Sequence, residues 1–517
     1  MKKLIISIPL LIIATGTLIT GCKKSDIDND YYNPDASVTA TIPSLYAGLF
    51  FNEKVMPRYW NLYTFQIPMM GTYSQTSGYT NSNKVYEQAV NYTANRWDYF
   101  YTTTIARYRE IEKYYSKLTT DAEKNGFQLF LETSRIFVYD QTAQMVDLWG
   151  DIPFSTAGQL NAQGTIVMAS YDKGADIYTN ILTDLKRISD YLATASPDAF
   201  YQTQLSAYDY VNKGSITKWR QYCNSLILRL AMRISYKDEA TAKSYIQTIL
   251  NNPTQYPVIS AATESIKIQP SSTTSTLTAV NDIRNGFGVN PFVGAKMVDS
   301  VMAASSDPRL PIYFTANKTG EYHGVPNTWN ATRVSDSTTA NYFSRWDSTT
   351  FTENNLFPGI LFTAAEVSFL KAEAYERWGG GNAKTAYETG IKQSIQFWVS
   401  VNNNSNYSGT KESMPSDAAI AIFLANPVVA YGTNNLEKIA TQKWIDFNVI
   451  QAQQAWAEWR RTKFPKLNFP TDASSVLSPN VPTRLLYPAT ESSLNATNYA
   501  TVKSGDNVST KVFWDVK

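Results

Sequence analysis

The sequence predicts a mainly α-helical protein with one loop-rich part and little β structure. Three stretches carry this prediction. Residues 218–233 repeat apolar side chains every three or four positions, as a helix with a buried stripe does. Residues 366–401 show the same period on both sides of the turn Gly379-Gly380-Gly381, which indicates two antiparallel helices. Residues 251–358 lose the period and are rich in Ser, Thr, Asn, Gly and Pro, which is typical of loops.

The N-terminus has the pattern of an export signal. Lys2 and Lys3 precede an apolar run over residues 4–19, which has the length of a signal-peptide core and is short for a membrane span. The following Leu18-Ile19-Thr20-Gly21-Cys22 resembles the lipobox of bacterial lipoproteins, in which the cysteine thiol carries the lipid. We therefore expect a signal peptide at 1–21, acylation (palmitate) at Cys22 and a flexible polar tether over 22–40. A plain secretory signal with an incidental cysteine is the alternative.

Helical periodicity then returns in several segments before the loop-rich middle. The segment that ends at Trp149 stops sharply, because Gly150 and Pro153 follow it. The predicted helices cover residues 97–118, 127–149, 176–192, 215–235 and 238–250, and helices resume at 363 with a last pair at 436–450 and 453–461.

The helix around residues 218–233 is expected to lie in the protein interior. Its stripe includes Trp219 and Cys223, so we interpret Cys223 as a small core side chain. Arg229 lies at the edge of the stripe, where an unpaired buried charge would cost several kcal/mol (order of magnitude). Glu366 and Glu373, seven residues apart on one predicted helix face, are the expected carboxylate partners.

The pair of helices around Gly379 also fits a tetratricopeptide repeat. Val367, Leu370, Ala383, Tyr387 and Gly390 take positions 4, 7, 20, 24 and 27 of that motif. The sequence therefore predicts a tetratricopeptide-like scaffold of helical pairs within a single domain. The expected boundaries are 41–517 for the domain, about 97–250 and 363–464 for the scaffold, and about 251–362 and 465–517 for the loop-rich insertions.

Several classes of chemistry lack their usual residues. The only histidine is His323, and no Gly-x-Ser-x-Gly turn, phosphate loop or dinucleotide fingerprint is present. Removing residues 1–21 leaves equal numbers of basic and acidic residues, which gives no reason to expect nucleic-acid binding. We predict no enzyme activity, no cofactor and no metal site; hydrolysis by carboxylates alone stays open, because Asp and Glu are too common to indicate it.

A set of motifs along the chain resembles one family, the SusD/RagB-type nutrient-binding outer-membrane lipoproteins of the SusD-like branch. The matches run in order from residue 22 to about 490 and so cover nearly the whole mature chain. They are Lys218-Trp219 with Leu228-Arg229-Leu230-Ala231-Met232-Arg233, Gln144-Met145-Val146-Asp147-Leu148-Trp149-Gly150-Asp151-Ile152-Pro153-Phe154, Asp307-Pro308-Arg309-Leu310-Pro311, Ala365-Glu366-Val367 with Ala372-Glu373-Ala374-Tyr375, Gln442-Lys443-Trp444 with Trp456 and Arg460-Arg461-Thr462, and Pro482-Thr483-Arg484 with Tyr487-Pro488.

The resemblance implies a helical scaffold joined to a loop-rich ligand-binding half. It also implies a lipid-anchored protein on the outer face of the outer membrane, acting with a SusC-type TonB-dependent transporter. Members of this family capture oligosaccharides, or oligopeptides in some branches, and carry out no bond chemistry. Two other classes stay open: a scaffold or assembly lipoprotein that binds no small ligand, and an envelope hydrolase.

The ligand-binding rings are expected outside the helices, because the helical rings are explained by apolar stripes. Two segments qualify, residues 60–79 and residues 322–346, and we expect the second to be the main platform. The alternative for each ring is that it only pins its loop to the scaffold. The candidate ligand-binding residues are Trp329, Trp346, Tyr322, His323 and Asn327 in the middle insertion, and Tyr73 and Tyr79 near the start.

Overall fold

Helices dominate the computed structural model, which describes residues 40–80, 83–273, 275, 277–278 and 280–517. The prediction of a mainly α-helical fold with little β structure is confirmed. The expected signal peptide and the expected lipidation site at Cys22 lie outside the described residues. No helix in the described part of the chain is both long and apolar enough to cross a membrane.

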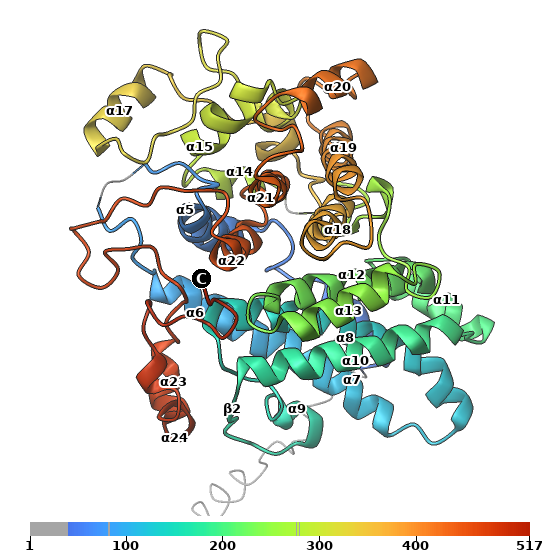
Figure 1. Cartoon of the computed structure of the whole chain (residues 1–517). Coiled ribbons are helices and arrows are strands. Elements are labelled where there is room, and N and C mark those ends of the chain that lie inside the picture. Colours follow the sequence, from blue (N-terminus) through green and yellow to red (C-terminus); the bar gives the residue numbers. More distant parts are fainter. Residues whose placement is uncertain (1–39, 81–82, 274, 276, 279) are drawn as a thin grey trace, which may run out of the picture. The chain divides into compact units, whose positions relative to one another are not determined.

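The longer helices of the first group match segments predicted from the sequence, whereas the helices before residue 75 and those at residues 159–163 and 199–208 were not predicted. Figure 1 shows α8, α10, α12 and α13 lying side by side in its lower part. The helices of this group are α3 (Ile42–Phe50), α4 (Tyr59–Asn61), α5 (Gly71–Ser74), α6 (Val90–Tyr99), α7 (Ala106–Ser116), α8 (Asp121–Trp149), α9 (Gln159–Gln163), α10 (Gly174–Thr194), α11 (Ala199–Tyr208), α12 (Ile216–Ile234) and α13 (Glu239–Leu250), with π-helical turns η1 (Leu62–Met70) and η2 (Phe100–Ile105).

Both ends of α8 have a local cause in the sequence. Thr120 and Glu123 form a capping box at its start, which satisfies backbone N–H groups that the helix leaves free. Gly150 follows its last residue with φ +83°, a conformation that favours glycine. The helix therefore ends where the sequence predicts.

The second group of helices lies in the C-terminal half and includes the middle insertion. In Figure 1 its orange helices α18, α19 and α20 lie in the upper part. The helices are α14 (Asp282–Phe287), α15 (Ala295–Met297), α16 (Leu310–Tyr313), α17 (Ala331–Thr339), α18 (Ala364–Trp378), α19 (Ala383–Asn403), α20 (Asp417–Ala425), α21 (Asn435–Phe447), α22 (Ala452–Thr462), α23 (Ala489–Leu494) and α24 (Ala496–Tyr499), with the turns η3 (Ala262–Glu264), η4 (Val298–Ala303), η5 (Ser348–Thr352) and η6 (Lys503–Gly505).

The hairpin of α18 and α19 has the expected turn and the expected close approach. α18 ends at Trp378, and Gly379 and Gly380 follow it with φ +73° and +88°. A Cβ atom at Gly390 would lie 2.7 Å from the ring of Phe369, so the helices meet where only glycine fits.

The few strands form three separate antiparallel pairs. Residues 266–268 of the middle insertion form one of these strands, in which Ile266 pairs with Phe362 and Ile268 pairs with Gly359. The pairs are β1 (Ile152–Pro153) with β2 (Tyr171–Asp172), β3 (Ile266–Ile268) with β6 (Gly359–Phe362), and β4 (Phe314–Thr315) with β5 (Arg345–Trp346).

The insertions are less irregular than the sequence predicts. Residues 251–362 contain α14 to α17, and the tail beyond residue 465 contains α23 and α24. Each of these helices has fewer than ten residues and at most three buried side chains, so it leaves no apolar period of useful length.

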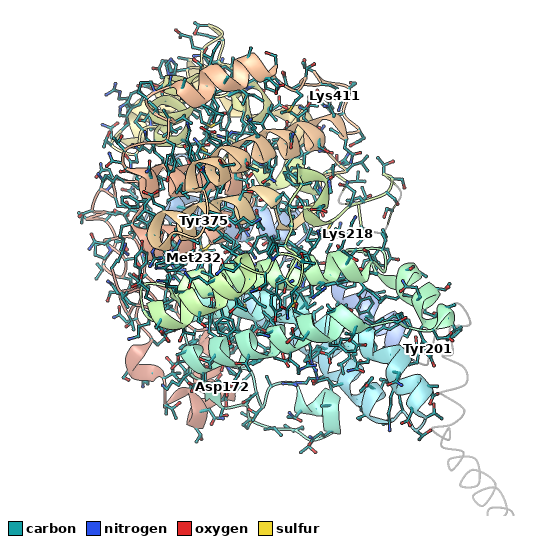
Figure 2. All side chains as sticks on the ribbon, turned by 45° about the vertical axis from the view of Figure 1, so that its right-hand side comes forward. Asp172, Tyr201, Lys218, Met232, Tyr375 and Lys411 are labelled. Atoms are coloured by element: carbon teal, nitrogen blue, oxygen red, sulfur yellow. The ribbon has the colours of Figure 1, made fainter. Side chains whose placement is uncertain are left out.

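Two large apolar cores are joined along α12 and α18. One core contains side chains of α3, α5 to α8 and α10 to α13, the other contains side chains of α14 to α16 and α19 to α21, and α18 and α22 contribute to both. Figure 2 labels Met232 of α12 and Tyr375 of α18 on either side of this seam. Cys223 is fully buried in the first core, as expected, and its Sγ donates to the Leu185 carbonyl.

Arg229 of α12 reaches α18, where the two cores meet, and binds one of its two expected partners. Its Nε and Nη2 atoms each lie 2.6 Å from the carboxylate of Glu366, and Asp140 accepts from Nη1 at 3.1 Å. The second expected partner, Glu373, instead binds Arg461 through two hydrogen bonds of 2.6 Å. Because seven residues advance α18 by nearly two turns, about 10 Å along its axis, the two carboxylates meet different arginines.

Candidate functional site

Three segments that are distant in the sequence enclose a surface hollow of about 370 Å³. This volume falls in the range of small-ligand sites, about 300–1,000 Å³. The hollow, called the candidate site below, is lined by Tyr79, Val85 and Tyr86 near the start, Asn327, Thr328, Trp329 and Asn330 in the middle insertion, and Asn468, Pro470, Thr471 and Asp472 in the tail. In Figure 1 the blue N-terminal segment, the region of α17 and the red tail meet on the left.

Trp329 supplies the largest ring of the candidate site. It is half-buried and packs against a small apolar cluster that includes Phe343, 5.9 Å away between ring centroids. The guanidinium of Arg333 lies over its indole, 3.6 Å from the ring centroid. Arg333 belongs to the exposed face of α17, so a ligand could stack on the opposite indole face or displace this guanidinium.

Tyr79 forms the wall between the candidate site and its neighbours. Its hydroxyl donates to the Thr72 carbonyl at 3.3 Å, and the side chain is 8% exposed. Burial raises the pKa of Tyr79 well above its ordinary value, and the adjacent Tyr86 adds to the shift. Tyr79 is therefore a neutral side chain, and its small exposed part faces the hollows that it lines.

The tail completes the site and holds the insertion in place. Asn327 donates from Nδ2 to the Asn468 carbonyl, and Tyr86 donates to the Pro470 carbonyl at 2.9 Å. Asp472 accepts from the backbone N–H of Val85 at 2.6 Å. Burial alone would raise the pKa of Asp472, but hydrogen bonds from Ser474 and Val85 outweigh it and lower the pKa.

The sequence analysis missed this contribution, because it treated residues 465–517 as a loop-rich insertion and named no site residue there. The contact between Asn327 and Asn468 joins residues 141 positions apart. No local pattern reports such a contact. The only signal was that residues 465–472 contain two prolines and lack a helical period, as loops do.

His323 and Tyr322 lie beside the candidate site and not in its lining. His323 Nδ1 lies 2.8 Å from a carboxylate oxygen of Asp299, and its ring stacks on Tyr342 with centroids 4.5 Å apart. Tyr342, which is 39% exposed, was not among the predicted site residues. Tyr322 is half-buried and packs against the second core.

Two predicted ligand residues are core side chains, and for them the prediction is wrong. Trp346 is 1% exposed because β5 alternates, with Arg345 outward and Trp346 inward against Phe314. Tyr73 is fully buried in α5, where its hydroxyl donates to the Tyr86 carbonyl at 3.1 Å. Neither ring can contact a ligand at the surface.

Two further hollows adjoin the candidate site and share its wall residue Tyr79. One, of about 270 Å³, also includes Asn327 and Asn468 and extends toward Lys296. The other, of about 420 Å³, also includes Val85 and extends toward Tyr63 and Tyr92. The candidate site is thus one part of a longer grooved surface.

A separate hollow of about 460 Å³ lies between α8, α10 and α11. Its ring Tyr201, labelled at the edge of the lower helices in Figure 2, packs on Gly126 so closely that a Cβ there would lie 2.3 Å from it. Tyr201 thus has a packing role, and none of the predicted site residues lines this hollow. We therefore place the candidate site at Trp329 and not here.

The candidate site has the composition of a binding surface. It offers two kinds of aromatic ring, several amide side chains and neutral hydroxyls around a shallow hollow. Within the described residues, no group of three or more His, Cys, Asp or Glu side chains is arranged to hold a metal ion.

Comparisons with known proteins identify the family and the fold. Residues 39–488 match the model of the SusD-like family described as "Starch-binding associating with outer membrane". No curated protein sequence matches the chain.

Solved structures of the same fold cover nearly the whole chain. A chitin-binding protein is 24% identical, with a TM-score of 0.75 over 92% of this chain and 100% of its own. A chitin-binding SusD homologue from Flavobacterium johnsoniae is 24% identical, with a TM-score of 0.72 over 92% and 99%. A Bacteroidetes SusD-like protein is 21% identical, with a TM-score of 0.73 over 92% and 100%. Because the family match spans most of the sequence, the chain belongs to the SusD-like family of starch-binding proteins that associate with the outer membrane.

Proposed function

We propose that the protein captures oligosaccharides at the cell surface through the candidate site and delivers them to a SusC-type TonB-dependent transporter. The observation that supports this proposal is the meeting of Trp329, Tyr79 and several amide side chains in one hollow. Sugar rings present apolar CH faces that pack on aromatic rings, while amides bind their hydroxyls. The chitin-binding descriptions of two structural neighbours point to the same ligand class.

Trp329→Ala tests the proposal. Stacking on one ring contributes about 0.5–1.5 kcal/mol beyond the area that it buries, so binding should weaken several-fold. Titration calorimetry of the wild type against maltose, chitin and cellulose oligomers and against oligopeptides measures both the ligand class and the loss. Phe200→Ala is the matched control, because Phe200 is 59% exposed on α11 and does not line the candidate site.

Each outcome of this titration bears on one alternative. Peptide binding that Trp329→Ala weakens would keep the site and change the ligand class. A wild type that binds no member of the panel would favour a scaffold lipoprotein without a small ligand. Equal affinity in Trp329→Ala and wild type would contradict the proposal that the ligand binds at the candidate site.

The proposed location is tested at Cys22, the one residue that the lipobox pattern offers for acylation. Cys22→Ala should abolish labelling by palmitate and shift the protein from the membrane to the soluble fraction. A variant that still carries the label would contradict the proposed anchor.

A further inference from the structure

Trp60 is the one tryptophan among the large apolar side chains that are exposed in the described part of the chain. Its indole is 56% exposed at the start of the N-terminal segment that leads to Tyr79. The ring of Tyr59 meets it edge-on, with centroids 5.2 Å apart. The aromatic rings that pack in the cores are buried, whereas the Trp60 indole faces water. Core packing therefore does not explain its position.

Trp60 belongs to a group of four rings, called the ring platform below: Tyr59, Trp60, Tyr63 and Tyr92. Tyr59 and Tyr63 lie nearly parallel, 4.9 Å apart and tilted by 31°. Tyr92 is 40% exposed and, like Tyr63, lines the hollow of about 420 Å³. Desolvation raises the pKa of Tyr59, and the nearby phenols of Tyr63 and Tyr92 add to it, which agrees with the clustering.

The ring platform is continuous with the candidate site. The hollow that Tyr63 and Tyr92 line also includes Tyr79 and Val85, and both of these residues line the candidate site. Its polar lining includes the neutral side chains of Thr64, Thr72 and Asn290. Lys84 and Glu87 also line it, and they form an ion pair in which their opposite charges compensate. Rings and polar groups therefore line the two adjoining hollows from Trp329 past Tyr79 to Tyr63 and Tyr92, and Trp60 adjoins this surface through the contacts of Tyr59 with Trp60 and with Tyr63.

We propose that the ring platform is a second subsite and that the ligand is an extended, uncharged chain of sugar rings long enough to reach both. This inference rests on the proposed function, because it assumes that the candidate site binds a glycan. A glycan chain that contacts both subsites binds more tightly than one that contacts a single subsite. The second contact forms at a high effective concentration once the first has formed. A chain too short to span the two subsites gains nothing from the second.

Trp60→Ala, measured with oligomers of increasing length, tests the inference. The probes are maltose and chitin oligomers from disaccharide to octasaccharide, titrated by calorimetry into wild type, Trp60→Ala, Trp329→Ala and the control Phe200→Ala. In the wild type, affinity should rise several-fold between the shortest binding oligomer and the longest. Trp60→Ala should remove that rise and leave the affinity for the shortest binder unchanged, whereas Trp329→Ala should weaken binding at every length.

The outcomes separate this inference from the proposed function. If Trp329→Ala weakens binding and Trp60→Ala matches the wild type at every length, the second subsite is refuted and the candidate site stands. A loss at Trp60→Ala that is equal for short and long oligomers would also overturn the inference, because it would make Trp60 part of one undivided site. Reduced association with the transporter and unchanged glycan binding in Trp60→Ala would make the ring platform a protein-docking surface. If no oligomer binds the wild type, both proposals fail.

Discussion

Trp219 shows how one side chain connects a loop to the first core. It is fully buried in α12, its ring faces Phe50 and Tyr222, and its Nε1 donates to a carboxylate oxygen of Asp209 at 2.7 Å. The same carboxylate accepts backbone N–H groups of Asn212 and Gly214, so it shapes the turn before α12. Ring packing and the turn therefore depend on each other.

Two substitutions at Trp219 separate these contributions. Trp219→Ala should lower the free energy of unfolding by about 3–5 kcal/mol, the usual effect of truncating a large core ring. Trp219→Phe keeps a six-membered ring and removes the five-membered ring of the indole together with the donor to Asp209, so a smaller loss of about 1–3 kcal/mol is expected. Urea denaturation measures both values, with Trp60→Ala as a surface control. Equal stability of Trp219→Ala and wild type would show that α12 does not carry the core.

At the scale of elements, the α18–α19 hairpin depends on a glycine. Gly390→Ala would raise intrinsic helix propensity by about 1 kcal/mol, which favours the variant. The new Cβ would lie 2.7 Å from the ring of Phe369, and such overpacking costs about 1–3 kcal/mol. We expect the clash to win and thermal stability to fall, as measured by calorimetry.

A second substitution shows whether the clash is the cause. Gly390→Ala combined with Phe369→Leu removes part of the ring that the Cβ meets, so the loss should be smaller than the sum of the two single effects. Additive losses would show that Gly390 acts by some other means than close approach of the helices.

The long helices could be predicted because each has a local pattern in the sequence. α8, α12 and the α18–α19 hairpin have long apolar stripes, caps or glycine turns, and all of these act within a few residues. The short helices α14 to α17 have no long apolar stripe, and a local cap such as Asn330 at the start of α17 is too weak a signal to predict so short a helix.

The candidate site was predictable only in part, for the same physical reason. Rings outside the predicted helices singled out Trp329 and Tyr79, and Asn327 was chosen as a polar neighbour of Trp329; all three line the hollow. The same criterion also selected Trp346, whose burial depends on which face of β5 it occupies. Asn468 and Asp472 had no aromatic signal, because they contribute polar groups across a long separation in the sequence.

At the scale of the whole molecule, buried charges join helices from both cores. Glu458 of α22 accepts from Arg233 of α12 at 2.8 Å and from Arg461 at 2.7 Å, and it also binds Lys443 of α21. Burial alone would raise the pKa of Glu458, but Arg461, Lys443 and Arg233 outweigh it and hold the pKa well below its ordinary value of 4.5. Glu373, which shares Arg461, has a lowered pKa for the same reason.

This network predicts a loss of stability in acid. As the pH falls below about 4.5, the unfolded chain protonates Glu458 while the folded protein keeps it ionised, so protons favour unfolding. The slope from this one group approaches about 1.4 kcal/mol per pH unit until the pH reaches its folded pKa. Urea denaturation at a series of pH values measures the slope, and Glu458→Gln should make it shallower although the variant is less stable overall. Glu388→Gln is the control. Glu388 is partly exposed and forms a long ion pair, 3.8 Å, with Lys384 on the same helix, and such a surface pair contributes little to stability. If Glu458→Gln leaves the pH dependence of the free energy of unfolding unchanged, other carboxylates cause the loss of stability in acid, and the prediction for this network is wrong.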